Sequence, residues 1–206
     1  MSKIRFCGDV HGKWRSFRDL VRESPYPVRQ VGDFGVGFKT EDFFDQCFGD
    51  MTSEDFQFIR GNHDHPTEVH ECEPHYIPDL TVQGDVMYLG GAFSIDYYWR
   101  TPGVNWWPDE EASVPLFEKF LKEYEEKCPR IMVTHDCPNF LTAKLDPKSG
   151  PYIPTRTRYY FEAALTTTLH RPHVWVFGHH HKSFDQVING TRFICLNELE
   201  TVDLEV

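Results

Sequence analysis

The sequence predicts an α/β fold, in which β-sheets are covered by helices. Short apolar runs alternate along the first half of the chain with segments whose apolar residues recur at helical spacing. Near the carboxyl end, the pair Asn189-Gly190 separates two strand-like runs, as expected of a β-hairpin. No internal repeat interrupts this order. Strands that first alternate with helices and then form hairpins favour a layered α/β arrangement.

The first half of the chain should contain three strands and two helices. Strands are expected over residues 4–7, 28–31 and 56–59, and each ends at or near a glycine. The first helix should end before Pro25, because proline cannot continue a helix. The apolar residues at helical spacing are Trp14, Phe17, Leu20 and Val21, followed by Phe43, Phe44, Cys47 and Phe48.

The second half should continue with strands, two helices and two long loops. The strands are predicted over residues 85–89, 92–95, 131–134 and 174–177, and the hairpin strands over residues 185–188 and 191–196. The helical stripes consist of Leu116, Phe117, Phe120, Leu121 and Tyr124, and of Phe161, Leu165 and Leu169. Pro115 suits the first turn of the earlier helix. Loops are predicted over residues 97–111 and 146–154, and the first of these is a loop or a lid.

Length and charge limit the classes of function. The 206 residues predict one domain over residues 1–206. No apolar run approaches the roughly 20 residues of a membrane span, and no signal region is visible, so we expect a cytoplasmic protein without a membrane partner. The formal net charge is −11 and no basic patch is visible, which argues against binding of long nucleic acids. The six cysteines lack C-x-x-C spacing, so we expect buried reduced thiols.

Histidine is the residue type that stands out, because the chain has 11 of them and three are adjacent. Five predicted strands end in the same way, with a small residue followed by side chains that can bind a metal. These ends are Gly8-Asp9-Val10-His11-Gly12, Gly32-Asp33, Gly61-Asn62-His63-Asp64, Thr134-His135-Asp136 and Gly178-His179-His180-His181. Side chains on short turns at strand ends can converge on one cleft. One such pair occurs by chance, but five in order indicate a metal site.

The donor types limit which metals would bind. Aspartate, asparagine and histidine without cysteine suit Mn, Fe or Zn rather than a thiolate site. The seven candidate ligands are Asp9, His11, Asp33, Asn62, His135, His179 and His181. They are too many for one tetrahedral ion, but they suit two ions that share a carboxylate. Two such ions can activate water and stabilise both oxygens of a displacement at phosphorus.

The motif series resembles that of calcineurin-like metallophosphoesterases. It extends from residue 9 to residue 181. A second stretch is similar to a loop in the small bacterial and phage members of this superfamily; it consists of Gly90-Gly91-Ala92-Phe93-Ser94-Ile95-Asp96, Arg100 and Trp106-Trp107-Pro108-Asp109-Glu110. The resemblance implies a four-layer α/β/β/α sandwich with a dinuclear metal site at its edge. It would place one metal on Asp9, His11, Asp33 and His181, and the other on Asp33, Asn62, His135 and His179. A hydroxide between the ions would attack phosphorus, while His63 would stabilise the phosphate and protonate the leaving group.

One departure from the family bears on the substrate. The Ser/Thr protein phosphatases of this superfamily carry Gly-Asp-x-Val-Asp-Arg-Gly at the second motif. This chain has Gly32-Asp33-Phe34-Gly35-Val36-Gly37 there, so phosphoprotein phosphatase activity is not expected. Asp64 is a catalytic candidate because it could orient His63 in place of the missing acidic residue; the alternative is a structural role next to the site.

The substrate phosphate needs another binding group. Arg100 is the first candidate, together with Asn62 and His63, since guanidinium binds phosphate through paired donors. Arg156 and Arg158 are second candidates. The nearby aromatic residues could stack on a base, cover the cleft or anchor the loop; they are Tyr97, Tyr98, Trp99, Trp106 and Trp107.

The expected function is hydrolysis of a small phosphate ester, including nucleotides, with two divalent ions. Mn is the first candidate ion, with Fe or Zn as alternatives. The ions would make the cleft locally positive, which favours small anions. A nuclease, a cyclic-nucleotide phosphodiesterase and a non-catalytic interaction module on the same fold are the alternatives. All eight motif positions are present, which argues against the interaction module. If the chain is of phage origin, we expect it in the host cytoplasm.

Overall fold

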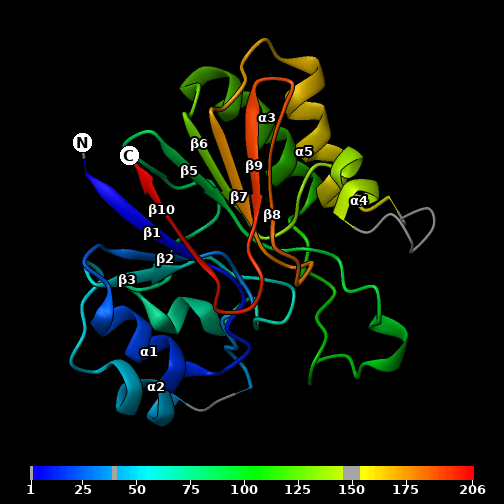
Figure 1. Ribbon diagram of the computed structural model, residues 1–206. Helices are drawn as coiled ribbons and strands as arrows, with labels where there is room; N and C mark the ends of the chain where they lie inside the picture. Colours follow the sequence, from blue (N-terminus) through cyan, green and yellow to red (C-terminus); the bar gives the residue numbers. More distant parts are fainter. Residues whose placement is uncertain (1, 39–40, 146–153) are drawn as a thin grey trace.

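The computed structural model describes residues 2–38, 41–145 and 154–206, and shows two stacked β-sheets with helices on both outer sides (Figure 1). The strands are β1 (Lys3–Cys7), β2 (Val28–Gln30), β3 (Phe56–Phe58), β4 (Val82–Gln83), β5 (Val86–Leu89), β6 (Ile131–Thr134), β7 (Val174–Phe177), β8 (Phe184–Ile188), β9 (Thr191–Cys195) and β10 (Thr201–Glu205). The helices are α1 (Trp14–Glu23), α2 (Glu41–Phe48), α3 (Val114–Lys127), α4 (Asn139–Leu145) and α5 (Arg156–Thr167), with 3₁₀ helices over Glu68–Cys72 and Tyr97–Trp99.

The two sheets combine parallel and antiparallel strands. The first sheet has the order β10-β1-β2-β3, in which β10 is antiparallel to β1 and the other neighbours are parallel. The second has the order β4-β5-β6-β7-β9-β8, in which β5, β6, β7 and β9 are parallel. Lys3 lies opposite Glu205, so the two chain ends lie side by side (Figure 1). Neighbouring parallel strands end at the same edge of a sheet, and the site lies where the carboxyl ends of β1, β2 and β3 in the first sheet meet those of β6 and β7 in the second.

Apolar side chains separate the layers. In β6, Ile131 and Val133 pack between the two sheets, whereas Met132 packs against the residues of α3, α4 and α5. This alternation follows from the two-residue period of a strand. On the other sheet, Phe6 faces the space between the sheets, and Cys7 packs with residues of α1 and α2. The four layers confirm the predicted α/β/β/α sandwich.

Residues 92–95 do not form the predicted strand. Gly91 has a φ of +83°, which turns the chain out of the extended conformation. The backbone N–H of Ser94 then donates to Oε1 of Glu110 (2.8 Å) instead of to a neighbouring strand. The apolar residues of this segment are therefore part of a loop held by side-chain hydrogen bonds.

The helical stripe predicted to end at Leu169 is also shorter than expected. Leu169 lies beyond α5 and is fully exposed. The hydroxyls of Thr167 and Thr168 donate back to the carbonyls of Ala163 and Ala164, both at 2.7 Å. Such bonds compete with the helical ladder, and α5 ends where they occur.

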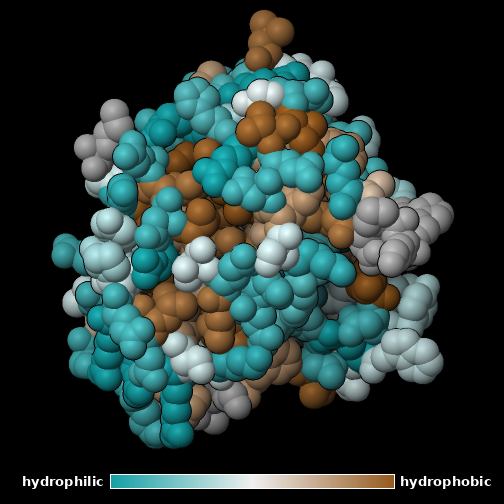
Figure 2. Space-filling view, in the orientation of Figure 1, coloured by the Kyte–Doolittle hydropathy of each residue, from teal (hydrophilic) through white to brown (hydrophobic). Residues whose placement is uncertain are grey.

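The remaining predictions concern loops, thiols and surface. Residues 97–111 form the predicted loop with one short 3₁₀ turn. Of the loop predicted over residues 146–154, residues 146–153 lie outside the described part of the chain. Cys7, Cys47, Cys137 and Cys195 are buried free thiols as expected, whereas Cys72 is half-buried and Cys128 is exposed. Within the described parts of the chain, no helix combines the length and apolar character needed to cross a membrane. Hydrophilic residues cover most of the face in Figure 2, with apolar ones between them.

Candidate metal centre

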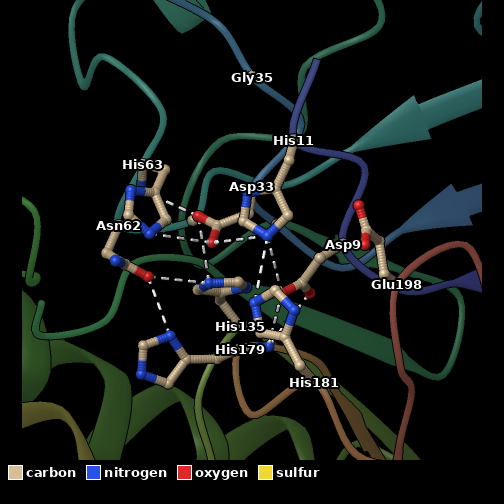
Figure 3. A network of polar contacts seen from close by, with 12 residues as sticks. Asp9, His11, Asp33, Gly35, Asn62, His63, His135, His179, His181 and Glu198 are labelled. Atoms are coloured by element: carbon tan, nitrogen blue, oxygen red, sulfur yellow. Dashed lines mark hydrogen bonds and ion pairs between the residues drawn. The ribbon is translucent and has the colours of Figure 1, made fainter. Parts of the chain in front are cut away.

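Five strand ends meet at one place in the structure. The segments that follow β1, β2, β3, β6 and β7 bring together eight side chains, which point toward a common centre (Figure 3). These side chains belong to Asp9, His11, Asp33, Asn62, His63, His135, His179 and His181. The structure therefore gathers all of the residues that the motif series singled out.

Tight turns place several of these side chains. His11, Asp33, His179 and His181 have φ angles of 49°, 58°, 65° and 50°. Residues other than glycine adopt such angles rarely, and Asp and His do so more often than most. Gly32 is needed for a different reason, because a Cβ there would lie 2.4 Å from Nδ1 of His135. Unusual backbone geometry is common where a site must bring donors close together.

The first donor group consists of Asp9, His11 and His181, whose candidate ligand atoms all lie within 4.8 Å of one another. Nε2 of His11 lies 3.2 Å from Nε2 of His181. Oδ2 of Asp9 lies 3.7 Å from the former nitrogen and 3.4 Å from the latter. Two imidazole nitrogens and a carboxylate oxygen around one small volume suit a divalent transition-metal ion.

The second donor group consists of Asp33, His135 and His179, which meet the same distance limit, with Asn62 beside them. Oδ1 of Asn62 lies 3.1 Å from Nε2 of His135 and 2.9 Å from Nδ1 of His179. Nδ1 of His135 lies 2.9 Å from the carbonyl oxygen of Val31, which can only accept. In neutral His135 the proton is therefore on Nδ1, and Nε2 presents a lone pair to the group.

Asp33 belongs to the second group but also faces the first. Its Oδ2 is 3.9 Å from Nε2 of His11, and its Oδ1 is 3.3 Å from Nε2 of His135. The backbone N–H of His63 donates to Oδ1 (2.9 Å) and fixes the carboxylate in this orientation. A carboxylate placed in this way can be shared by two ions.

The charges of the centre fit divalent cations. Burial acts to lower the pKa of His135, but the charge of Asp33 outweighs it and raises this pKa to about 10. Burial alone would raise the pKa of Asp33, but the charges of His135, His63 and His11 bring it below its usual value. Because a ligating imidazole must be neutral, a bound cation would take the place of the His135 proton. The nitrogen and oxygen donors thus suit two ions of the predicted kind.

His63 and Arg100 lie beside the two donor groups. Nε2 of His63 is 3.9 Å from Oδ2 of Asp33. Nη1 of Arg100 lies 2.6 Å from Nδ1 of His63, and Asp96 holds the same guanidinium through two contacts of 2.7 Å. Burial lowers the pKa of His63, Asp33 opposes this effect and Arg100 adds to it. These four residues and Asn62 line a cavity of about 400 Å³, so the Arg100 side chain lies at the same cavity as His63 and Asp33.

Asp64 is hydrogen-bonded to the backbone. It is fully buried, and both of its oxygens accept hydrogen bonds from backbone amides. The donors are the N–H groups of Phe34, Gly35, Val36 and Gly61, at 2.6–3.0 Å. These bonds tie the loop after β2 to the loop after β3. Asp64 therefore holds the two loops together, which agrees with the structural alternative for this residue; its catalytic role stays a prediction.

The other candidate arginines and aromatic residues lie around the centre. Arg156 pairs with Glu111 at 3.6 Å and lines a different cavity. Trp107 is buried and anchors the loop, whereas Tyr98 and Trp99 are 78% and 90% exposed. Tyr97 and Trp106 are half-buried, so the aromatic residues of the loop range from buried to largely exposed.

The sequence assigned no role to two buried residues next to the centre, Ser94 and Glu110. Nδ2 of Asn62 donates to Oγ of Ser94 (2.9 Å), and Oγ of Ser94 lies 2.6 Å from Oε2 of Glu110. Burial raises the pKa of Glu110, while the hydrogen bonds from Ser94 act in the opposite direction. Both residues lie in the stretch that resembles a loop of small bacterial and phage members of the family, but their contacts with Asn62 and with each other appear only in the folded structure.

Comparison with protein families identifies the fold. A model of the calcineurin-like phosphoesterases matches residues 2–183. The chain belongs to this family. As a calcineurin-like phosphoesterase it is a hydrolase that acts on phosphoric ester bonds. A comparison with curated protein sequences found no match.

Solved structures share the fold of this phosphoesterase at low sequence identity. A Thermus thermophilus protein, TT1561, is 15% identical, with 97% of this chain and 90% of that chain covered and a TM-score of 0.58. A dimetal phosphatase from Danio rerio is 14% identical, with 97% and 88% covered and a TM-score of 0.52. A Staphylococcus aureus protein provisionally assigned as a 5'-nucleotidase is 14% identical, with 99% of this chain covered and a TM-score of 0.52. This chain spans 51% of the length of that last protein.

A second buried cluster of the phosphoesterase lies next to the metal centre. Asp136, Cys137 and His180 also bring ligand atoms within 4.8 Å of one another. Here, however, Nε of Arg158 donates to Oδ2 of Asp136 (2.7 Å), and Nε2 of His180 lies 2.9 Å from Oδ1. Burial alone would raise the pKa of Asp136, but the charge of Arg158 brings it well below its usual value. A protein side chain already supplies the cation in this cluster.

Proposed function

We propose that this phosphoesterase hydrolyses small phosphate esters with two divalent ions bound at the centre described above. One ion would be held by Asp9, His11 and His181 and the other by Asn62, His135 and His179, with Asp33 shared between them. The position of Asp33, which belongs to the second donor group and also faces the first, carries this proposal. Mn is the first candidate ion and Fe or Zn the alternatives, because the donors are nitrogen and oxygen atoms without thiolate.

Three side chains of the cavity would bind the substrate phosphate or transfer a proton in the reaction. When bound, the two ions supply Lewis-acid polarisation of the phosphoryl group and activation of water. His63, which lies beside Asp33 on the side of the cavity, would hold the phosphate and give a proton to the leaving oxygen. Arg100, held by Asp96, would present N–H donors to the phosphate oxygens. The side-chain amide of Asn62 would also lie next to the phosphate.

Charge and cavity size support a small substrate. The cavity of about 400 Å³ suits a small ester, and the chain has a formal net charge of −11. A negative surface repels a long polyanion, while two bound cations would attract a small anion into the centre. Nucleotides belong to this substrate class, and the fold is shared with the provisionally assigned 5'-nucleotidase.

Paired hydrolysis assays would test the proposal. We expect Mn-dependent hydrolysis of nitrophenyl phosphate or of bis-nitrophenyl phosphate, and the preferred compound would separate a monoesterase from a diesterase. Nucleotides, cyclic nucleotides and plasmid DNA in the same assay would distinguish a nucleotidase from a cyclic-nucleotide phosphodiesterase or a nuclease. Metal analysis should find two ions per chain. At most one ion per chain would rule out the two-metal mechanism, and two ions without any hydrolysis would favour a non-catalytic module.

A further inference from the structure

We propose that Ser94 and Glu110 are positioning residues that determine which end of the Asn62 amide faces the metal centre. The inference rests on the proposed function, because it assumes an ion next to Asn62. Ser94 and Glu110 are each only 2% exposed, and both lie in the long loop between β5 and α3. A serine hydroxyl and a carboxylate buried at this depth must satisfy each other or a neighbouring group.

The hydrogen bonds run in one direction from Asn62 to Glu110. Oγ of Ser94 lies 2.6 Å from Oε2 of Glu110, which is the length of a hydroxyl donating to a carboxylate. The backbone N–H of Ser94 donates to Oε1 of the same carboxylate (2.8 Å). A hydroxyl carries a single proton, so Oγ of Ser94 can only accept from Asn62. The end of the Asn62 amide that faces Ser94 must therefore be Nδ2, at 2.9 Å.

This constraint sets the chemistry at the other end of the amide. With Nδ2 on Ser94, Oδ1 of Asn62 lies 3.1 Å from Nε2 of His135 and 2.9 Å from Nδ1 of His179. An amide oxygen has lone pairs for a cation, whereas the amide nitrogen offers only N–H donors. The two ends of an asparagine amide have nearly the same size, so packing alone would not select one of them. The polar chain through Ser94 makes that selection.

Glu110 is itself held in place. The backbone carbonyl oxygen of Glu110 accepts a hydrogen bond from Nη1 of Arg60 (2.9 Å), and Arg60 forms an ion pair with Asp79 at 3.0 Å. The same loop between β5 and α3 also carries Arg100, which contacts His63. The same residues that orient the Asn62 amide thus anchor the loop that brings Arg100 to the cavity.

Two variants test the selection directly. Ser94→Ala removes the acceptor for Nδ2, so the Asn62 amide is free to turn. Glu110→Gln keeps the volume but replaces one acceptor oxygen by an NH₂ group, which cannot accept from both the N–H and the hydroxyl of Ser94. In each variant we expect the affinity of the second donor group for Mn²⁺ to fall about 10–100-fold, the usual effect of losing a residue that orients a metal ligand.

Thr157→Ala is the matched control. Oγ1 of Thr157 donates to Oε1 of Glu111 (2.9 Å), so it is also a buried hydroxyl bonded to a carboxylate of the same loop. Glu111 directly follows Glu110, but its bond joins the loop to α5 and not to Asn62. We expect Thr157→Ala to leave the affinity for both ions unchanged.

Calorimetric titration of Mn²⁺ into the full chain gives the readout, which does not depend on activity. Ser94→Ala should weaken binding of the second ion in the natural chain but cause no further loss in an Asn62→Ala background. The same loss in both backgrounds, or an equal loss in Thr157→Ala, would overturn the inference in favour of general loosening of the loop. If melting of the chelated protein shows that Ser94→Ala does not fold, the isosteric Glu110→Gln decides the question.

The two proposals fail in different ways in this experiment. A natural chain that binds none of Mn²⁺, Fe²⁺ and Zn²⁺ would overturn the proposed function and the inference with it. Two ions bound with equal affinity by the natural chain, Ser94→Ala and Glu110→Gln would overturn the inference alone.

Discussion

Two buried clusters of aspartate and histidine lie side by side in this phosphoesterase, and they carry their positive charge in different ways. In the metal centre, the charge partners of Asp33 are histidines, whose ring nitrogens can exchange a proton for a metal ion. In the second cluster, Asp136 pairs at 2.7 Å with Arg158, whose guanidinium does not lose its proton. The first cluster can accept a divalent cation, whereas the second already has a permanent one.

The same two turns build both clusters. After β6, His135 joins the metal centre and its neighbour Asp136 joins the second cluster. After β7, His179 and His180 divide in the same way. The difference comes from Arg158, which reaches Asp136 from α5. Residue type and spacing therefore do not suffice to define a metal site, because a nearby arginine can occupy the place of the ion.

The largest effect should come from Asp33→Asn, which removes the charge shared by the two donor groups but keeps the volume. We expect kcat/KM to fall on the order of 10³-fold or more, since two-metal catalysis contributes several kcal/mol. Metal analysis should show fewer than two ions per chain. Asp185→Asn, in the exposed pair with Arg192, is the control and should leave both readouts unchanged. Full activity of Asp33→Asn would show that the two groups do not share this carboxylate.

Arg158→Met would break the second cluster instead. It leaves the buried Asp136 carboxylate without its main cation, and such a loss costs about 3–5 kcal/mol of unfolding free energy. Urea unfolding with a chelator present would measure this cost independently of bound ions. Arg192→Met, in an exposed ion pair with Asp185, should cost less than about 1 kcal/mol. Equal costs for the two variants would contradict a structural role for the Arg158–Asp136 pair.

The candidate ligands could be predicted because each lies just after a strand, and the carboxyl ends of parallel strands meet at one edge of a sheet. Asp9, Asp33 and Asn62 each stand next to a glycine that ends an apolar run, which is a local signal. The roles of Asp64 and Ser94 carried no such signal. Asp64 binds backbone amides of a loop about 30 residues away in sequence, and Ser94 acts through Glu110. Those partners are known only once the chain has folded.

The fold shows the same division between local and distant information. The hydrophobic spacing predicted α1, α3 and the central strands, because burial of one face decides them. It missed β10, whose sequence TVDLE alternates polar and apolar residues but extends over only five positions and pairs with β1 at the opposite end of the chain. It also missed α4, which is only seven residues long. Elements this short give too few repeats for the spacing to identify them.

His63→Ala would sharpen the comparison within the metal centre, by separating binding of the ions from turnover. Nε2 of His63 lies 3.9 Å from Oδ2 of Asp33, and His63 is not among the proposed metal ligands, so we expect two ions per chain to remain. Turnover should fall about 100-fold, within the range for loss of a general acid. Metal analysis and kcat on the same preparation would measure both quantities. Loss of an ion together with turnover would instead make His63 part of the metal site.

The smallest effect should come from Arg100→Ala, because the ions would still hold the phosphate. Loss of hydrogen bonds from a charged donor corresponds to about 1.5 kcal/mol or more, so we expect KM to rise about 10-fold with a smaller change in kcat. Arg156→Ala is the control, since Arg156 pairs with Glu111 and lines a different cavity. Asp96→Asn should follow Arg100→Ala in direction, because Asp96 holds the guanidinium through two contacts of 2.7 Å. If KM rises equally in Arg100→Ala and Arg156→Ala, the effect reflects the net charge of the chain, and Arg100 does not hold the phosphate.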